Sequence, residues 1–317
     1  MVHQQMLRNA LLYLSNQPRV FNFVRHNGMA KGFANRFVAG ETLDTALAAV
    51  KQLNRKGITA TLDLLGESVR NEKEARESAA AYIEILDRIK SENLDANASV
   101  KLTAMGLDIS EDLCVANMQN ILDRAHELQT FVRLDMESSE YTQKTLDLFY
   151  DRLYPSYRGN VGIVLQSYLY RSYSDVEEAN KAGARVRLCK GAYKEPPSVA
   201  YPEKKDVDDS YLRCMRTLLA DGHYPGIATH DEVMVNETKR FAKDNDISRD
   251  SFEFQMLYGV RRDLQEKLVR EGYRMRVYVP FGTQWYPYLM RRLAERPANV
   301  AFITGNIVKE MVGRNRR

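Results

Sequence analysis

The strongest constraint on this chain is an alternation of two residue patterns that begins near residue 57. Short β-branched and apolar runs, typical of buried strands, alternate with longer stretches that suit helices with one apolar face. Strands are predicted at 57–66, 98–103, 131–137, 161–166, 184–191, 226–231, 252–257 and 274–280. Helices are predicted after them at 67–92, 111–128, 138–152, 172–182, 206–221, 231–245, 260–271 and 285–296. Eight such units require parallel pairing through right-handed crossovers, which predicts an α/β protein with a closed (βα)8 TIM barrel.

An open, doubly wound sheet is the alternative to a barrel. Such a sheet normally carries a glycine-rich turn after its first strand, whereas the first strand here ends in "LLGES". The sequence also contains no P-loop motif. We therefore expect residues 1–56 to form an N-terminal helical extension and residues 57–317 to form the barrel catalytic domain.

Composition excludes several classes of protein. The net charge of +4 is too small to indicate nucleic-acid binding, and no run of 18 apolar residues predicts a membrane span. The three cysteines form no CxxC motif, which favours free thiols in the cytoplasm over disulfides or a zinc site. The first 40 residues contain no Asp or Glu, and "MLRNALLYL" within them predicts a helix that packs on the barrel or contacts a membrane surface.

Polar residues gather where the predicted strands end. In a (βα)8 barrel the chemistry takes place at the carboxyl ends of the strands. The residues at these ends are Asp63, Lys101, Asp135, Gln166, Arg187 with Lys190, His230 with Asp231, Gln255 and Tyr278. Lys101 and Asp135 end neighbouring strands, so they form either an ion pair or the wall of a pocket for a charged substrate. The other histidines show no metal-ligand spacing with His230, so we expect no metal.

The most distinctive segment is "VRLCKGAYKEP" at 186–196. One parity of a barrel strand faces the interior, which places Arg187 or Lys190 inside the barrel or at its mouth. A buried cation needs an anion, either a ligand or an internal partner such as Asp135 or Asp63. Gly191 permits close approach of the backbone to a ligand.

A second polar stripe occurs in "YLMRRLAE" at 288–295. Tyr288, Arg291, Arg292 and Glu295 share one helical face. If this last helix packs beside the eighth strand, the face is solvated. If the helix lies over the barrel mouth, the two guanidinium groups suit a bound carboxylate.

Seven of these motifs occur in an order that resembles the proline dehydrogenase family, as "VKLTAMGL", "RLDMES", "RLCKGAY", "ATHD", "FEFQMLYGVRRDL", "RVYVPFGTQW" and "YLMRRLAE". The resemblance runs from about residue 41 to about residue 302, and the length is similar to the monofunctional bacterial type. It implies a distorted (βα)8 barrel whose last helix lies over the mouth. It also implies that proline is bound by Lys101, Asp135, Leu257, Tyr278, Tyr288, Arg291 and Arg292.

The same resemblance implies an FAD cofactor, bound by Gln166, Arg187, Lys190, Gly191, Ala192, Tyr193, Thr229, His230 and Glu295. The implied reaction is oxidation of L-proline to Δ1-pyrroline-5-carboxylate by hydride transfer to flavin N5, with a quinone as electron acceptor. The acid-free N-terminal residues would suit transient contact with the inner face of the membrane, and the sequence leaves open whether a pyrroline-5-carboxylate dehydrogenase receives the product. Many relatives have His-Asn where this chain has His230-Asp231.

Two other functions are compatible with the residues alone. A Schiff-base aldolase would use Lys190 or Lys101 as its nucleophile. A non-catalytic barrel would bind an anionic partner through Arg261, Arg262, Arg291 and Arg292.

Overall fold

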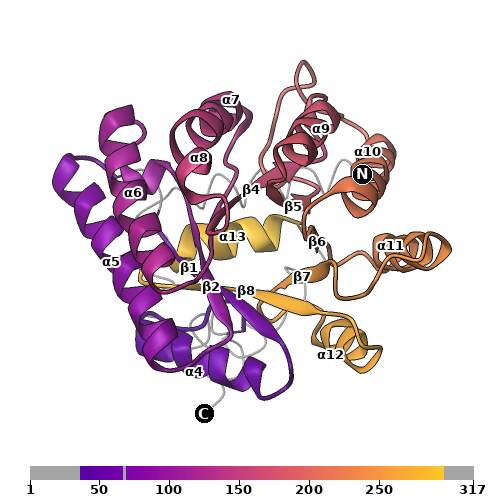
Figure 1. Ribbon diagram of the computed structural model, residues 1–317, viewed down its shortest axis with the longest axis horizontal. Helices are drawn as coiled ribbons and strands as arrows, with labels where there is room; N and C mark the ends of the chain where they lie inside the picture. The colour runs from indigo at the N-terminus through magenta and orange to yellow at the C-terminus, as the bar shows by residue number, and fades with distance from the viewer. Residues whose placement is uncertain (1–35, 67–68, 296–317) are drawn as a thin grey trace, which may run out of the picture.

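The computed structural model describes residues 36–66 and 69–295, with side chains described up to residue 290. Eight parallel strands pair in sequence order, and β1 pairs with β8 to close the barrel (Figure 1). The strands are β1 (Thr59–Leu64), β2 (Ala96–Val100), β3 (Val132–Leu134), β4 (Val161–Gln166), β5 (Arg185–Cys189), β6 (Gly226–Ala228), β7 (Glu253–Leu257) and β8 (Met275–Phe281). The predicted fold class is therefore confirmed.

Helices surround the barrel in Figure 1 and alternate with its strands along the chain. They are α4 (Leu43–Asn54), α5 (Glu72–Ser91), η1 (Thr103–Met105), α6 (Glu111–Glu127), α7 (Ser139–Asp147), η2 (Leu148–Leu153), α8 (Tyr154–Tyr157), α9 (Ser172–Ala182), α10 (Lys204–Asp221), α11 (Glu232–Asp244), α12 (Arg262–Arg270) and α13 (Trp285–Glu295). Several begin at a side-chain cap: Thr42, Asn71, Ser110 and Asp231 each accept a hydrogen bond from a first-turn N–H.

The two parities of the strands differ in chemistry. Apolar residues such as Leu62 and Val277 belong to the buried hydrophobic core. Residues of the other parity bond across the barrel: Arg187 of β5 reaches Ser99 of β2 at 3.3 Å. The barrel interior is consequently polar and charged.

The structure corrects some predicted boundaries. Most strands are shorter than expected, so Lys101 and Asp135 follow their strands directly. The helix predicted at 138–152 continues to Tyr157 through the π-helical segment η2, and Pro155 stands at the start of α8. Proline has no N–H for the regular helical hydrogen bond, which accounts for an irregular register here.

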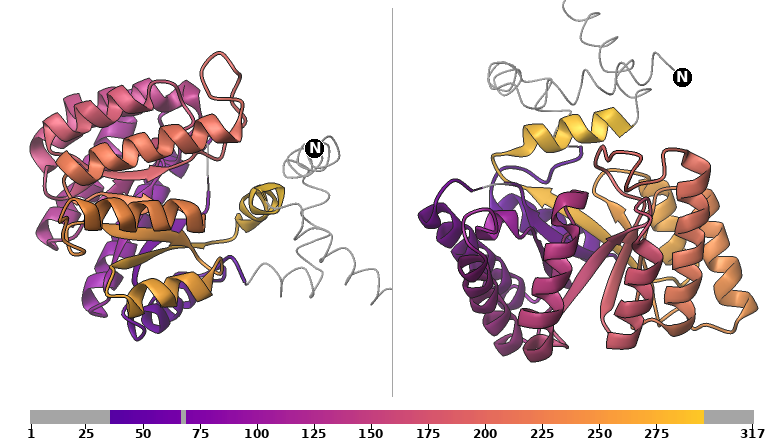
Figure 2. Two further views of the ribbon diagram at one scale, coloured as in Figure 1. Left: turned by 90° about the vertical axis from the view of Figure 1, so that its right-hand side faces the viewer. Right: turned by 90° about the horizontal axis from the view of Figure 1, so that it is seen from above.

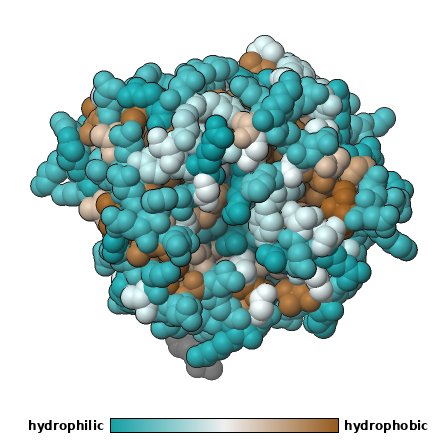
Figure 3. Space-filling model, viewed as in Figure 1, coloured by the Kyte–Doolittle hydropathy of each residue, from teal (hydrophilic) through white to brown (hydrophobic). Residues whose placement is uncertain are grey.

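Helix α13 lies beyond the end of the barrel at which β8 finishes (Figure 2). Figure 3 shows the molecule from the side away from α13, where hydrophilic residues cover most of the surface. Among the helices in the described part of the chain, none combines the length and apolar character needed to cross a bilayer. The predicted helix at "MLRNALLYL" falls outside the described residues.

Candidate functional site

A cavity of about 560 Å³ lies at the carboxyl ends of the strands. It brings together most of the residues that the sequence predicted for substrate and cofactor: Lys101, Asp135, Gln166, Arg187, Lys190, Gly191, Ala192, Tyr193, Thr229, His230, Leu257, Tyr278 and Tyr288. Tyr288 comes from α13, which therefore contributes to the cavity wall. The side chains of Arg291, Arg292 and Glu295 lie outside the described residues.

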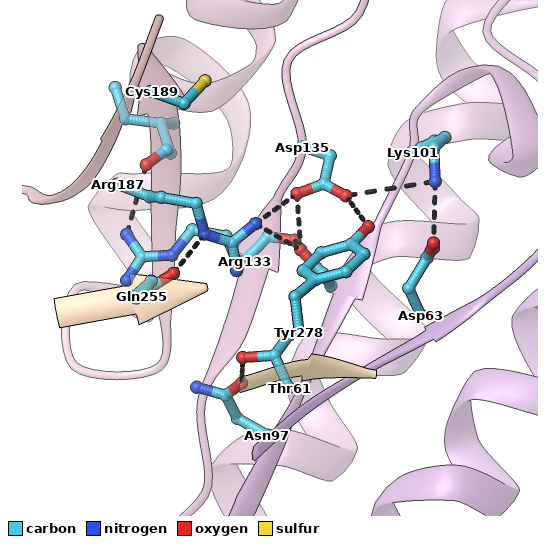
Figure 4. A network of polar contacts seen from close by, with 12 residues as sticks. Thr61, Asp63, Asn97, Lys101, Arg133, Asp135, Arg187, Cys189, Gln255 and Tyr278 are labelled. Atoms are coloured by element: carbon cyan, nitrogen blue, oxygen red, sulfur yellow. Dashed lines mark hydrogen bonds and ion pairs between the residues drawn. The ribbon is translucent and has the colours of Figure 1, made fainter. Parts of the chain in front are cut away.

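Asp135 is the centre of the polar network in the cavity floor (Figure 4). Its Oδ1 accepts hydrogen bonds from Ser99 Oγ at 2.6 Å and from Arg187 Nη1 at 2.8 Å. Its Oδ2 accepts one from Tyr278 OH at 2.5 Å. Burial, followed by the nearby Asp135 and Asp63 carboxylates, raises the pKa of the Tyr278 hydroxyl well above its ordinary value, so this hydroxyl remains a donor.

The ion pairs in the floor differ from the simplest prediction. Lys101 contacts Asp63 at 2.9 Å and Asp135 only at 3.9 Å, so the predicted Lys101–Asp135 pair is secondary. The main partner of Asp135 is Arg187, as the alternative of an internal ion pair anticipated. Burial raises the pKa of Asp63 above its ordinary value, although the Lys101 ammonium acts in the opposite direction.

Arg187 is fixed on several sides. It is 6% exposed, its Nε donates to Gln255 Oε1 at 2.6 Å, and its guanidinium carbon lies 5.1 Å from the centre of the Tyr278 ring. These contacts hold a permanent positive charge at the bottom of the cavity. A ligand group that gains negative charge above Arg187 would be stabilised there.

Lys190 follows β5 directly, lines the same cavity and has a different set of partners. Its Nζ donates to Asp208 at 2.6 Å and to Asp231 at 2.9 Å. Asp231 also caps α11 through the Val233 N–H, so its carboxylate serves two structural purposes. Burial alone would raise the pKa of Asp231, but the hydrogen bond and charge of Lys190 outweigh it and hold the pKa below its ordinary value.

The loop after β5 lies against the cavity through a glycine. Gly191 has φ +118°, and a β-carbon there would come within 2.4 Å of the Tyr168 ring. Glu195 fastens the same loop to its neighbours: it accepts hydrogen bonds from Ser139 N at 2.8 Å and from Tyr168 OH at 3.2 Å. Glycine is required at residue 191 because the Tyr168 ring fills the space that a side chain would occupy, and the Gly191 backbone also lines the cavity.

His230 acts as an acceptor within the protein. The Leu257 N–H donates to His230 Nε2 at 2.9 Å, so in the neutral ring the proton resides on Nδ1. Both His230 and Thr229 line the cavity. Two cations and the Gly191 backbone line the cavity, a set that fits a cofactor that carries phosphate or develops negative charge.

Sequence reasoning did not single out Ser99, Glu195 and Asp208. Ser99 lies two residues before Lys101, so the period of two along a strand identifies it as an interior residue. Glu195 belongs to the distinctive "VRLCKGAYKEP" segment, but nothing in the sequence indicates its partner. Asp208 comes from α10, and its contact with Lys190 depends on the tertiary structure alone.

Comparisons with known proteins give a family match and several relatives. Residues 46–305 match the family model described as proline dehydrogenase. The chain is 42% identical over 303 residues to proline dehydrogenase 2 of Bacillus subtilis (strain 168), covering 96% of this chain and 99% of that protein.

Longer proteins also resemble the chain. The bifunctional protein PutA of Escherichia coli (strain K12) is 29% identical over 311 residues, which cover 84% of this chain and 24% of PutA. A crystal structure of proline utilization A from Bdellovibrio bacteriovorus, inactivated by N-propargylglycine, superposes with a TM-score of 0.80 at 28% identity. That likeness covers 96% of this chain and 38% of the larger one.

Proposed function

The chain belongs to the proline dehydrogenase family and oxidises proline in the first step of proline catabolism, and on that premise we propose that its cavity binds FAD together with L-proline. The observation that carries this proposal is that Arg187, Lys190 and the Gly191 backbone line one cavity. When bound, the flavin would supply the hydride acceptor: the proline carbon next to the ring nitrogen would lose a hydride and the nitrogen would release a proton to solvent, which gives Δ1-pyrroline-5-carboxylate.

The residues of this chain divide the remaining tasks. Gln166, Lys190, Gly191, Ala192, Tyr193, Thr229, His230 and Glu295 hold the cofactor, and Arg187 places a positive charge where negative charge develops. Lys101, Arg291 and Arg292 bind the proline carboxylate. Asp135, Leu257, Tyr278 and Tyr288 shape the pocket for the ring. Positioning of this kind supplies on the order of 7–11 kcal/mol of barrier lowering.

The alternative functions find less support in the contacts. Lys190 is held by Asp208 and Asp231, and Lys101 is held by Asp63, so each lysine nitrogen is engaged within the protein and is not presented to a carbonyl substrate. Arg261 is engaged by Asp263 at 2.9 Å and by Glu232 at 3.2 Å, so it is poorly placed to recruit an anionic partner.

The absorption spectrum of the purified protein tests the proposal first. We expect the bands of bound FAD, and we expect anaerobic L-proline to bleach them. A colourless protein, or a yellow protein whose spectrum ignores proline, would contradict it.

The Arg292→Met variant tests the carboxylate clamp. We expect the KM for proline to rise by about 100-fold, since a charge-assisted bidentate contact of roughly 1.5–3 kcal/mol is lost, while FAD is retained. Steady-state kinetics and flavin content measure the two effects. Unchanged proline saturation would remove Arg292 from the clamp.

We further propose that electrons pass to a membrane quinone, and that a pyrroline-5-carboxylate dehydrogenase consumes the product. The bifunctional name of the longer PutA relative supports the second link. The protein would then be cytoplasmic, with the acid-free N-terminal segment contacting the inner face of the membrane. Deleting residues 1–35 should reduce cosedimentation with anionic liposomes, and equal cosedimentation would refute this contact.

A further inference from the structure

A line of hydrogen bonds continues from the cavity floor into the barrel interior. Glu253 stands at the start of β7, away from the cavity, and is 3% exposed. Its Oε1 accepts hydrogen bonds from Gln255 Nε2 at 2.6 Å and from Arg276 Nε at 2.7 Å. Its Oε2 accepts one from Tyr224 OH at 3.2 Å. Glu253 is therefore a fully engaged buried carboxylate outside the cavity lining.

The amide of Gln255 lies between two groups of opposite hydrogen-bonding character. On one side the Arg187 Nε–H can only donate, so it requires the amide oxygen. On the other side the Glu253 carboxylate can only accept, so it requires the amide NH₂. Gly226 leaves the space for this arrangement, because a β-carbon there would come within 2.4 Å of Gln255 Nε2. The orientation of Gln255 is thus determined from both ends.

We propose that Glu253 is a positioning residue for proline oxidation, which holds Arg187 in place through the amide of Gln255. This inference rests on the proposed function, in which Arg187 contacts the cofactor. Without an acceptor at residue 253, the Gln255 amide is held from one end only, by the Arg187 Nε–H, and its rotation is less restricted. Arg187 would then be held less firmly by its hydrogen bond to Gln255. Asp135 and Tyr278 contact the same guanidinium group, so their side chains would also become more mobile.

The double variant E253M/R276M removes the hydrogen-bond acceptor at residue 253 without changing the net charge of the barrel interior. Removing Glu253 alone would leave the Arg276 guanidinium buried without its partner, whereas replacing both members of a buried ion pair with apolar residues is tolerated far better. The net charge of the barrel interior stays the same in the double variant, but the Gln255 NH₂ loses its acceptor.

Two measurements read the result in the purified full-length protein. Hydrogen exchange at the Arg187 Nε–H, followed by NMR and assigned from its loss in Arg187→Lys, should become at least about 10-fold faster. The kcat for proline should fall by about 10-fold with a change in KM below about 2-fold, because the carboxylate contacts are untouched. A purely structural role for Glu253 would leave the Arg187 exchange rate unchanged once the protein is folded.

Two variants serve as controls. K56M/E266M removes the exposed Lys56–Glu266 ion pair, and we expect it to leave both measurements at the wild-type values. E253Q/R276M removes the same two charges as E253M/R276M but keeps an oxygen acceptor at residue 253, so the Arg187 Nε–H should stay protected. Slow exchange in E253M/R276M, or exchange in E253Q/R276M as fast as in E253M/R276M, would overturn the proposal.

If E253M/R276M does not fold, the exchanged pair E253Q/Q255E gives the answer. It places a carboxylate directly against the Arg187 Nε–H, so that proton should remain protected, and rapid exchange there would overturn the proposal. The exchange measurement does not depend on turnover. A wild-type protein that fails to oxidise proline or to bind FAD would therefore refute the proposed function separately.

Discussion

At the scale of single residues, this protein places charged side chains where most barrels place apolar ones. Asp63, Asp135, Arg187 and Glu253 are all nearly inaccessible to solvent. Burial of an unpaired charge costs several kcal/mol, and each of these groups accordingly has a partner of opposite charge within 3 Å. The pairs hold the side chains of the cavity floor in one geometry, which an active site that only orients its reactants requires.

Asp208→Asn should lower the free energy of unfolding by an amount that depends on pH. Burial alone would raise the pKa of Asp208, but hydrogen bonds from Lys190 and Lys204 outweigh it and hold the pKa below the ordinary 3.8. The unfolded state then binds a proton more tightly than the folded state, so this stabilisation is present above about pH 4 and is lost as the pH falls further.

Urea unfolding measures this effect. The free energy of unfolding of the wild type should exceed that of Asp208→Asn by roughly 0.5–1.5 kcal/mol at about pH 6. This difference should shrink toward about pH 3. A difference that is constant across this range would mean that the carboxylate charge of Asp208 is not what stabilises the fold.

At the scale of elements, the loop between β5 and α10 depends on one carboxylate. Glu195 joins this loop to the first turn of α7 through Ser139 N and to the segment after β4 through Tyr168 OH. The Gly191 backbone is held against the Tyr168 ring on the same side. The position of the residues that line the cavity from this loop is thereby tied to two other elements of the barrel.

Glu195→Ala should loosen this loop without unfolding the barrel. We expect the Kd for FAD to rise by about 10-fold. Without Glu195 the loop is less ordered before binding, so part of the binding free energy is spent on ordering it. Fluorescence titration of the apoprotein with FAD measures the change. Glu203→Ala, in the same connection but without a side-chain capping bond, should bind as wild type does. Equal affinities in the two variants would contradict the assigned role of Glu195.

At the scale of the whole molecule, stability depends on closing β1 against β8. Six consecutive pairs, from Thr59↔Arg276 to Leu64↔Phe281, join the first strand to the last. Leu62 lies in this seam between Ala98 and Val279 and is 0% exposed. The two ends of the barrel sequence are therefore packed as tightly as neighbouring units are.

Leu62→Ala should lower the free energy of unfolding by about 2–5 kcal/mol, through lost burial and the cavity that remains. Val233→Ala serves as the control, since Val233 is 62% exposed and its truncation should cost less than about 0.5 kcal/mol. Denaturant titration followed by circular dichroism compares the two. A cost below about 1 kcal/mol for Leu62→Ala would show that the seam contributes little to stability.

The sequence by itself determined that the chain forms a barrel and that the polar residues gather at the carboxyl ends of its strands. Strand and helix periods depend on local residue order, and the positions of Asp63, Asp135 and Arg187 in the chain place them at strand ends in any barrel of this topology. Only the tertiary structure decided which partners these groups take. Asp135 pairs with Arg187 from across the barrel more closely than with Lys101 from the next strand. Contacts across a closed barrel depend on its tilt and stagger, and contacts from Glu195 and Asp208 depend on how loops and helices dock, neither of which is encoded in local spacing.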